Sequence, residues 1–240
     1  IPRPSRNTKA VSDWCVSFAQ ERGLECYQDA ANNILIKAPA APGYETAEPV
    51  ILQGHLDMVC EKAPGNPINM ERDGLRLIVD GDFVRADGTT LGGDDGIAVA
   101  YGLAILDSPE LKHPALELIF TVDEEVGMDG AREIDLSMLK GNRLLNLDSE
   151  EEGIFLTSCA GGARVTCTLP LTHHAADETL VPCKLEISGL QGGHSGEEIH
   201  KGRGNSNMLF GRVLFALCRQ LPVRLVSVEG GLADNAIPRN

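Results

Sequence analysis

Three apolar segments of this chain each end in acidic or imidazole side chains, and this pattern limits the fold more than any other feature. The segments are "VILQGHLD" (50–57) with His55 and Asp57, "IFTVDEE" (119–125) with Glu124 and Glu125, and "LLNLD" (144–148) with Asp148. Short apolar runs are typical of buried strands, and open α/β sheets form their sites at the carboxyl ends of strands. The sequence therefore predicts an α/β fold with a polar site where several strands end.

Helices are expected between these strands. Apolar residues recur with helical spacing over 11–19, with Asn7 or Thr8 as the cap and Gly23 as the stop, and 96–108 reads as a second helix. The other expected elements are strands at 33–38, 49–59, 115–122 and 142–148 and a hairpin over 75–87. Alternating strands and helices predict an α/β sandwich, and the hairpin indicates a mixed sheet.

The pattern of apolar residues changes near residue 160. The segments 162–171 and 180–190 alternate apolar with polar residues, as half-exposed antiparallel strands do. A helix capped by Asn205 and a further strand at 223–230 follow. We therefore expect two domains, residues 1–160 and residues 161–240, of which the second is a smaller α+β unit.

The composition argues against several classes of partner. A formal charge of −14 disfavours nucleic acid, whose phosphates require clustered Lys and Arg. The longest apolar stretch, 97–106, is too short to span a membrane, and no signal peptide is visible. Seven cysteines without a C-x-x-C motif fit a reduced, cytoplasmic protein better than a disulfide framework.

Carboxylates crowded at strand ends must be neutralised by protons or by cations. His55, Glu125 and Asp148 are competent zinc ligands, as is Asp94 ahead of the second helix, and a shared carboxylate could bridge two ions. Asp57 lies on the same face of the strand as His55, so it could hold the imidazole ring by its other nitrogen. The sequence therefore favours a metal site with one or two ions.

Glu124 and Glu125 are adjacent, so on an extended chain their side chains should diverge and should not both bind one ion. One is expected to be a ligand and the other a general base beside a metal-bound water. Simpler interpretations exist for single pairs: His55 and Asp57 could form a buried hydrogen-bonded pair, and the aspartates at 94–95 could cap a helix. The agreement of four separate segments favours metal binding.

Six motifs resemble the co-catalytic di-zinc peptidases, most closely the bacterial aminoacyl-histidine dipeptidases, and they follow the order of that family. They are "GHLDMV" (54–59), "GTTLGGDDGI" (88–97), "EEVGMDGA" (124–131), "NLDSEEEG" (146–153), "GLQGGHSGEEIH" (189–200) and "NAIPR" (235–239). The resemblance implies a zinc-exopeptidase-like sandwich as the catalytic metal-binding domain, followed by the start of a ferredoxin-like lid that handles the substrate.

The resemblance also implies a set of metal ligands. His55 and Asp148 would bind one zinc ion, Glu125 would bind the other, and Asp94 would bridge the two. A cis peptide between Asp94 and Asp95 is expected as well. The implied cofactors are two Zn²⁺ ions, for which Mn²⁺ or Co²⁺ could substitute.

Four further residues take part in the reaction that the resemblance implies. Asp57 would orient the histidine ligand, and Glu124 would take a proton from the bridging water and pass it to the leaving amine. His194 would stabilise the oxyanion, and Asn235 would hold the substrate backbone or carboxylate. The implied activity is hydrolysis of dipeptides, preferentially Xaa-His, by a metal-bound hydroxide.

Several alternatives remain beside this interpretation. A related di-zinc tripeptidase, aminopeptidase or N-acyl amino acid deacylase would share the same ligands, and a non-catalytic metal-binding paralogue would lack the base. The partner implied is a small peptide. Monomer and homodimer both remain open, because some relatives dimerise through the smaller domain.

Both ends of the chain suggest a piece of a longer protein. The chain begins at Ile1 without Met and stops at Asn240, just after "NAIPR". The family's last histidine ligand has no counterpart among His113, His173, His174 and His200. We therefore expect an N-terminal fragment whose remaining ligand lies beyond this chain, and which alone is inactive or poorly folded.

Overall fold

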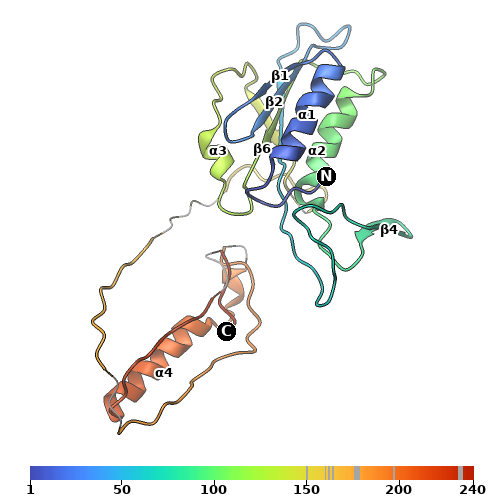
Figure 1. The fold of residues 1–240 in the computed structure, drawn as a ribbon. Helices are drawn as coiled ribbons and strands as arrows, with labels where there is room; N and C mark the ends of the chain where they lie inside the picture. The colour runs from blue at the N-terminus through green and yellow to red at the C-terminus, as the bar shows by residue number, and fades with distance from the viewer. Residues whose placement is uncertain are drawn as a thin grey trace. The chain divides into compact units, whose positions relative to one another are not determined.

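The computed structural model describes residues 1–149, 151–159, 161, 163, 165–175, 179–196, 198–231 and 235–240. Backbone contacts divide the chain into two compact units, Ile1–Ala160 and Gly161–Asn240. The first unit contains a mixed sheet with helices packed on it (Figure 1).

A five-stranded sheet with the order β1-β2-β6-β3-β7 forms the centre of the first unit. Its strands are β1 (Glu25–Gln28), β2 (Ile34–Ala38), β3 (Val50–His55), β6 (Leu116–Thr121) and β7 (Arg143–Asn146). β2 is antiparallel to β1 and β6, whereas β3 is parallel to β6 and β7. The sheet is therefore mixed, as predicted, and the carboxyl ends of β3, β6 and β7 lie at the same end of it.

The helices α1 (Lys9–Glu21) and α2 (Gly93–Leu106) cover one face of the sheet, and α3 (Asp129–Glu133) lies on the other side (Figure 1). The core under α1 and α2 is made of apolar side chains closed to solvent, among them Cys15, Ala19, Ile34, Ile36, Leu52, Leu103, Leu118 and Phe120. Leu35, Ile51 and Ile119 point to the opposite face and pack near Ile134, Met138 and Leu139. Burial on both faces explains the nearly continuous apolar sequences of the central strands.

Both long helices of the first unit form where they were predicted, with ends that differ by two or three residues. α1 starts after Thr8, whose side chain makes no capping hydrogen bond, and ends before Gly23, which has a φ of 65°. Inside α2, Asp94 and Asp95 have non-helical dihedral angles, and the peptide bond between them is cis, as the resemblance implied. The regular turns of α2 therefore begin at Gly96.

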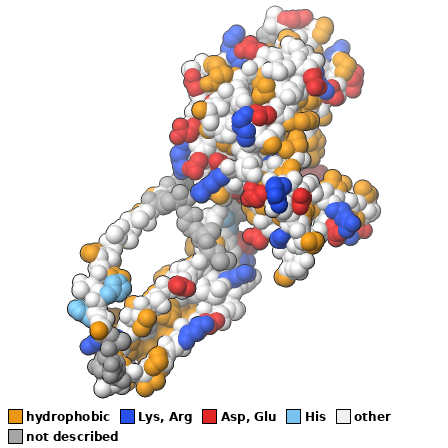
Figure 2. Space-filling model, in the orientation of Figure 1, with side chains coloured by type: hydrophobic (Ala, Val, Ile, Leu, Met, Phe, Trp, Pro, Cys, Tyr) orange, Lys and Arg blue, Asp and Glu red, His pale blue; other side chains and the backbone are white. Residues whose placement is uncertain are grey.

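The predicted hairpin is also present. β4 (Leu77–Asp80) pairs antiparallel with β5 (Phe83–Ala86), and the chain turns between Asp80 and Phe83. On the face of the molecule shown in Figure 2, acidic and basic side chains are interspersed over the first unit. Among the described residues, no helix combines the length and the apolar character that crossing a membrane requires.

The second unit contains the helix α4 (Ser206–Gln220) and the short 3₁₀ helix η1 (Ile199–Lys201). Asn205 caps α4 as predicted, because its side-chain oxygen accepts a hydrogen bond from the Met208 backbone N–H at 3.0 Å. The helix therefore begins where the sequence places its cap.

The described residues of the second unit do not form the expected strands. The described residues of 162–171, 180–190 and 223–230 adopt no β-strand. A strand needs backbone hydrogen bonds to a neighbouring strand, whereas apolar residues of these segments, such as Val181 and Val226, are exposed to solvent. The alternation of apolar and polar residues indicates that these segments could join a sheet. It does not show whether another strand is available to pair with them.

Candidate metal centre

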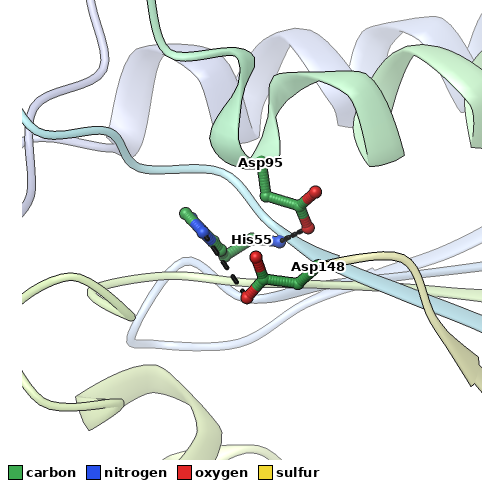
Figure 3. A group of neighbouring side chains, drawn as sticks. All are labelled: His55, Asp95 and Asp148. Atoms are coloured by element: carbon green, nitrogen blue, oxygen red, sulfur yellow. Dashed lines mark hydrogen bonds and ion pairs between the residues drawn. The ribbon is translucent and has the colours of Figure 1, made fainter. Parts of the chain in front are cut away.

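The polar strand ends identified in the sequence lie together in the first unit. His55 is the last residue of β3, Glu124 and Glu125 follow β6, and Asp148 follows β7. The parallel arrangement of the three strands explains why these side chains meet. The start of α2 contributes further carboxylates, and Figure 3 shows Asp95 and Asp148 on either side of His55.

The imidazole of His55 lies at the centre of the site. This side chain is buried, and its Nε2 lies 3.0 Å from Asp94 Oδ1 and 3.9 Å from Asp148 Oδ2. The same nitrogen lies 4.0 Å from Glu124 Oε2. One nitrogen atom therefore faces carboxylates from three separate segments of the chain.

Two sets of side chains have potential ligand atoms close enough together to hold a metal ion. His55, Asp94 and Glu125 form one set, and His55, Asp95 and Asp148 form the other, with the ligand atoms of each set within 4.8 Å of one another. The structure thus brings all four proposed ligands near each other, but it places Asp95 rather than Asp94 in the set with Asp148. Sequence reasoning missed Asp95, although the repeated aspartate in "LGGDDG" was an available signal.

Asp95 is held against the end of β3. The side chain is buried, and its Oδ2 accepts a hydrogen bond from the His55 backbone N–H at 3.1 Å. A Cβ at Gly54 would lie 2.5 Å from this oxygen and 2.5 Å from the Cβ of Ala98. The missing side chain at Gly54 therefore allows the start of α2 to approach the strand.

Asp57 fixes the orientation of the His55 ring. Nδ1 donates a hydrogen bond to the main-chain oxygen of Asp57 at 3.0 Å and lies 3.4 Å from the carboxylate Oδ1. With its proton on Nδ1, a neutral ring presents the lone pair of Nε2 to the facing carboxylates. This is the arrangement that a metal-binding histidine needs.

The adjacent glutamates lie in a turn, in contrast to the extended chain assumed from the sequence. Asp123 has a φ of 58°, and the residues that follow it form the turn. The backbone N–H groups of Glu124 and Glu125 donate to Asp57 Oδ1 at 3.1 Å and to Oδ2 at 3.3 Å. Because the backbone turns here, both glutamate side chains can lie near His55.

Burial, together with the crowding of carboxyl groups, raises the pKa values of Glu125, Asp95 and Glu124. Burial, followed by repulsion from Asp94, raises the pKa of Glu125 to about 7. Burial, followed by repulsion from Asp148, raises the pKa of Asp95 to about 6, and burial also raises the pKa of Glu124. These groups resist being charged together, which is the situation in which a divalent cation can replace protons.

The pKa values of His55 and Asp57 move in the directions expected for an ion pair. Burial opposes a charge on the His55 ring, but the hydrogen bond and attraction from Asp57 outweigh it and raise the pKa to about 9. Burial would raise the pKa of Asp57, but hydrogen bonds from His55, Ser5 and the Glu124 backbone N–H lower it. Asp57 therefore retains its negative charge beside the His55 ring.

The donor chemistry of the site fits divalent cations. Each set combines one imidazole nitrogen with carboxylate oxygens, which are ligands that zinc accepts. Manganese and cobalt accept the same donors. The two sets share His55, whose Nε2 offers a single lone pair, so His55 itself would bind only one ion.

His194 and Asn235 lie in the second unit, on two loops joined by backbone hydrogen bonds. The Ser195 N–H donates to the main-chain oxygen of Asn235 at 2.8 Å, and the Ile237 N–H donates to the main-chain oxygen of Gly193 at 2.7 Å. The structure therefore brings these two proposed substrate-binding residues close to each other.

The His194 loop is also held by its own side chains. The Gly196 N–H donates to His194 Nδ1 at 3.1 Å, so in a neutral ring the proton lies on Nε2. Glu198 accepts from the His194 backbone N–H at 3.0 Å and pairs with Lys201 and Arg203, each at 2.8 Å. The Lys201 hydrogen bond, the His194 N–H and Arg203 together lower the pKa of Glu198 to about 2.

Comparison with known proteins agrees with this fold, although no family model matches the chain. The whole chain is 42% identical to the cytosol non-specific dipeptidase of Escherichia coli (strain K12) and covers 49% of it. The structure of aminoacylhistidine dipeptidase from Vibrio alginolyticus matches the whole chain with 38% identity and a TM-score of 0.65, with 49% of that protein covered. The aminopeptidase PepT from Bacillus cereus shares the fold at 16% identity, with a TM-score of 0.52, over the whole chain and 60% of PepT.

The fold and the comparisons identify this chain as a homologue of peptidases. In particular, the resemblance of its motifs to the aminoacyl-histidine dipeptidases is confirmed. The chain spans about half the length of these relatives, and the match fits their N-terminal half.

Proposed function

We propose that the protein is a zinc-dependent dipeptidase that prefers Xaa-His substrates, and that residues 1–160 form its metal-binding catalytic domain. The observation that supports this most directly is the pair of ligand sets around the single buried His55. The name of the Escherichia coli relative, cytosol non-specific dipeptidase, supports the reaction and a cytoplasmic location.

His55, Asp94, Glu125 and Asp148 are the proposed ligands of two ions, and Asp95 is a further candidate. A bound divalent ion would supply Lewis-acid chemistry, which polarises a peptide carbonyl and acidifies water at neutral pH. The ligands come from four separate segments held by the sheet and α2, so the protein arranges them before any substrate binds.

Glu124 is the proposed general base. Its carboxylate is half-buried, and Oε2 lies 4.0 Å from His55 Nε2, beside the ligand atoms but outside both ligand sets. Burial raises its pKa, which makes the carboxylate a better proton acceptor. We infer that Glu124 takes a proton from the attacking water and later gives it to the leaving amine.

The second unit is the proposed substrate domain. His194 can donate from Nε2, because Nδ1 already accepts the Gly196 N–H, and this donor suits a developing oxyanion. Asn235, joined to the same loop, would hold the backbone or carboxylate of the peptide. The proposed partner is thus a small peptide, and neither nucleic acid nor a membrane is a proposed partner. The protein would bind the peptide as a monomer or as a homodimer.

The test uses the intact protein depleted of metal and then titrated with Zn²⁺. We expect hydrolysis of Xaa-His dipeptides to appear with zinc and to disappear with a chelator. His55→Ala and Asp148→Asn should weaken zinc binding, whereas Asp135→Asn, at an exposed aspartate outside the site, should not. Tripeptides and N-acyl amino acids in the same assay separate the related activities. Dipeptide hydrolysis that persists without bound metal would contradict the proposal.

A further inference from the structure

The first residues of the chain run against the segment that carries His55 and Asp57. Pro4 and Met58 form an isolated parallel bridge, and the Met58 N–H donates to the Arg3 oxygen at 3.1 Å. Three residues later, the Arg6 N–H donates to Asp123 Oδ1 at 2.5 Å, just before the glutamate turn. The segment Arg3–Arg6 therefore contacts two of the loops that form the metal centre.

Ser5 supplies a hydrogen bond to the buried Asp57 carboxylate. Its hydroxyl donates to Asp57 Oδ2 at 2.7 Å, the shortest of the contacts to that carboxylate. The other contacts come from the His55 ring and from the backbone N–H groups of Glu124 and Glu125. Ser5 thus completes the set of groups that fixes the orientation of Asp57.

The Arg3 guanidinium joins the residues after β3 to the loop before α2. Nη1 donates to the main-chain oxygens of Leu56, at 2.7 Å, and of Asp57, at 3.0 Å. Nη2 donates to the Gly92 oxygen, two residues before Asp94. One side chain therefore holds the two segments that provide His55 and Asp94.

The glycines of "LGGDDG" leave space for this guanidinium. A Cβ at Gly92 or at Gly96 would lie 2.6 Å from Arg3 Nη2. Gly92 also has a φ of 71°, whereas no positive φ requires glycine at position 96. The close approach of Arg3 is therefore a physical reason why position 96 is occupied by glycine.

We propose that Arg3 and Ser5 are positioning residues of the metal centre, Ser5 through Asp57 and Arg3 through the junction of the His55 and Asp94 segments. The proposal rests on the proposed function, because it assumes that the carboxylate cluster binds metal. Neither side chain is a proposed ligand. Ser5 would act through Asp57, which contacts the His55 ring and the glutamate turn, and Arg3 would act through the main chain beside His55 and Asp94.

The first test concerns Ser5 and uses Co²⁺ as the probe. Metal-depleted intact protein is titrated with Co²⁺ and followed by the visible absorption of the bound ion. Ser5→Ala should weaken binding up to about tenfold and change the absorption band, because Ser5 holds Asp57, the residue that orients the His55 ligand. Ser5→Thr, which keeps the hydroxyl, should restore both. Ser17→Ala is the control, because the Ser17 hydroxyl donates to the Asp13 main-chain oxygen on the exposed face of α1.

Kinetics give a second measurement of the Ser5 variants. Asp57 also holds the Glu124 backbone, so Ser5→Ala should lower kcat more than it raises KM at saturating metal. If Ser5→Ala does not fold, Ser5→Cys keeps the volume with a weaker donor and is measured instead. Unchanged Co²⁺ affinity and unchanged kcat in the folded variant would overturn the role of Ser5.

The second test concerns Arg3 and uses a double-mutant cycle with Gly96→Ala. The new methyl group should displace the guanidinium while favouring the helix. Arg3→Met and Gly96→Ala should each weaken Co²⁺ binding about tenfold, and the double variant should lose little more. Gly211→Ala in α4 is the control, because nothing lies near its Cβ position.

The outcomes separate this proposal from the proposed function. If the wild-type protein binds no Co²⁺, the metal-dependent function itself fails. If the wild-type protein binds Co²⁺ and all Arg3 and Ser5 variants bind it equally well, only the positioning role fails. Fully additive losses for Arg3→Met and Gly96→Ala would overturn the role of Arg3, since the two changes would then act independently.

Discussion

Nδ1 of His55 donates to the main-chain oxygen of Asp57, while the carboxylate of Asp57 accepts the backbone N–H groups of the glutamate turn. The same buried aspartate therefore determines which imidazole nitrogen faces the cluster and where the proposed base lies. Binding and reaction should for this reason be sensitive to a change at position 57 that leaves every proposed ligand in place.

The first prediction concerns Asp57→Asn. The amide has nearly the same shape, but its nitrogen cannot accept a hydrogen bond and the charge that stabilises His55 is lost. We expect metal affinity to fall by about 10- to 100-fold. A competition titration with a chelator of known affinity measures this, with Asp135→Asn as the matched control. Wild-type affinity in the Asp57→Asn variant would show that His55 does not depend on the Asp57 carboxylate.

The second prediction concerns Glu124→Ala. Because Glu124 lies outside both ligand sets, metal occupancy should be retained while kcat falls by about 10²- to 10⁴-fold. Metal content by atomic emission and steady-state kinetics on the same sample check both parts. Glu133→Ala, at an exposed position, is the control. Retained turnover with full metal occupancy would exclude Glu124 as the base.

The third prediction concerns Gly54→Ala. The new Cβ would lie 2.5 Å from Asp95 Oδ2 and from Ala98 Cβ, so α2 must move away from β3. Overpacking of this kind should lower the free energy of unfolding by about 1–3 kcal/mol. Thermal unfolding followed by circular dichroism measures the change. Gly74→Ala, with open space around its Cβ position, should unfold like the wild type.

The fourth prediction concerns the reactivity of Cys15. Burial, together with the nearby Cys26, raises the pKa of the Cys15 thiol to about 12. The reactive thiolate is therefore scarce up to about pH 10, and the side chain is closed to solvent. Iodoacetamide should label exposed Cys218 in the native protein and Cys15 only after unfolding, as peptide mass spectrometry would show. Equal labelling of both in the native state would contradict the buried position.

The fifth prediction concerns the stability of the second unit at low pH. The pKa of Glu198 is about 2 in the folded protein, below its ordinary value of 4.5. A depressed carboxyl pKa stabilises the fold fully above the unfolded pKa, and this contribution is lost as the pH falls through the folded pKa. Glu198→Gln should remove the difference. Hydrogen exchange at the His194 N–H between about pH 5 and pH 2 compares the two proteins. Identical pH dependence in both would contradict the low pKa.

Much of the first unit could be predicted because its signals are local. The apolar runs 50–57, 119–125 and 144–148 each mark a strand and the polar residues after it, and a mixed sheet with parallel neighbours brings those ends together. Periodicity and chain direction therefore predicted that His55, the two glutamates and Asp148 lie at neighbouring strand ends, whereas the resemblance implied which residues bind metal. The capping role of Asn205 is equally local, because the cap and its N–H partner are three residues apart.

Other features depend on contacts that no local pattern contains. The Arg3 contact with Gly92 spans 89 residues, and the Ser5 contact with Asp57 spans 52. The position of Asp95 follows from the close approach that Gly54 permits. The glutamate turn depends on the positive φ of Asp123, which the apolar pattern of β6 does not reveal. In the second unit, alternation predicted strands, but pairing decides whether a strand forms.

β7 is an edge strand of the sheet and pairs only with β3 among the described residues, yet it leads directly into Asp148. Two hydrogen bonds hold its alignment with β3. The Leu147 N–H donates to the main-chain oxygen of Gln53 at 3.0 Å, and the Asn146 side chain donates to Gln53 Oε1 at 2.5 Å. A slip of one residue would turn alternate side chains to the opposite face and carry Asp148 away from His55. An ion bound between those two residues would thus select the correct alignment of this border strand over shifted ones.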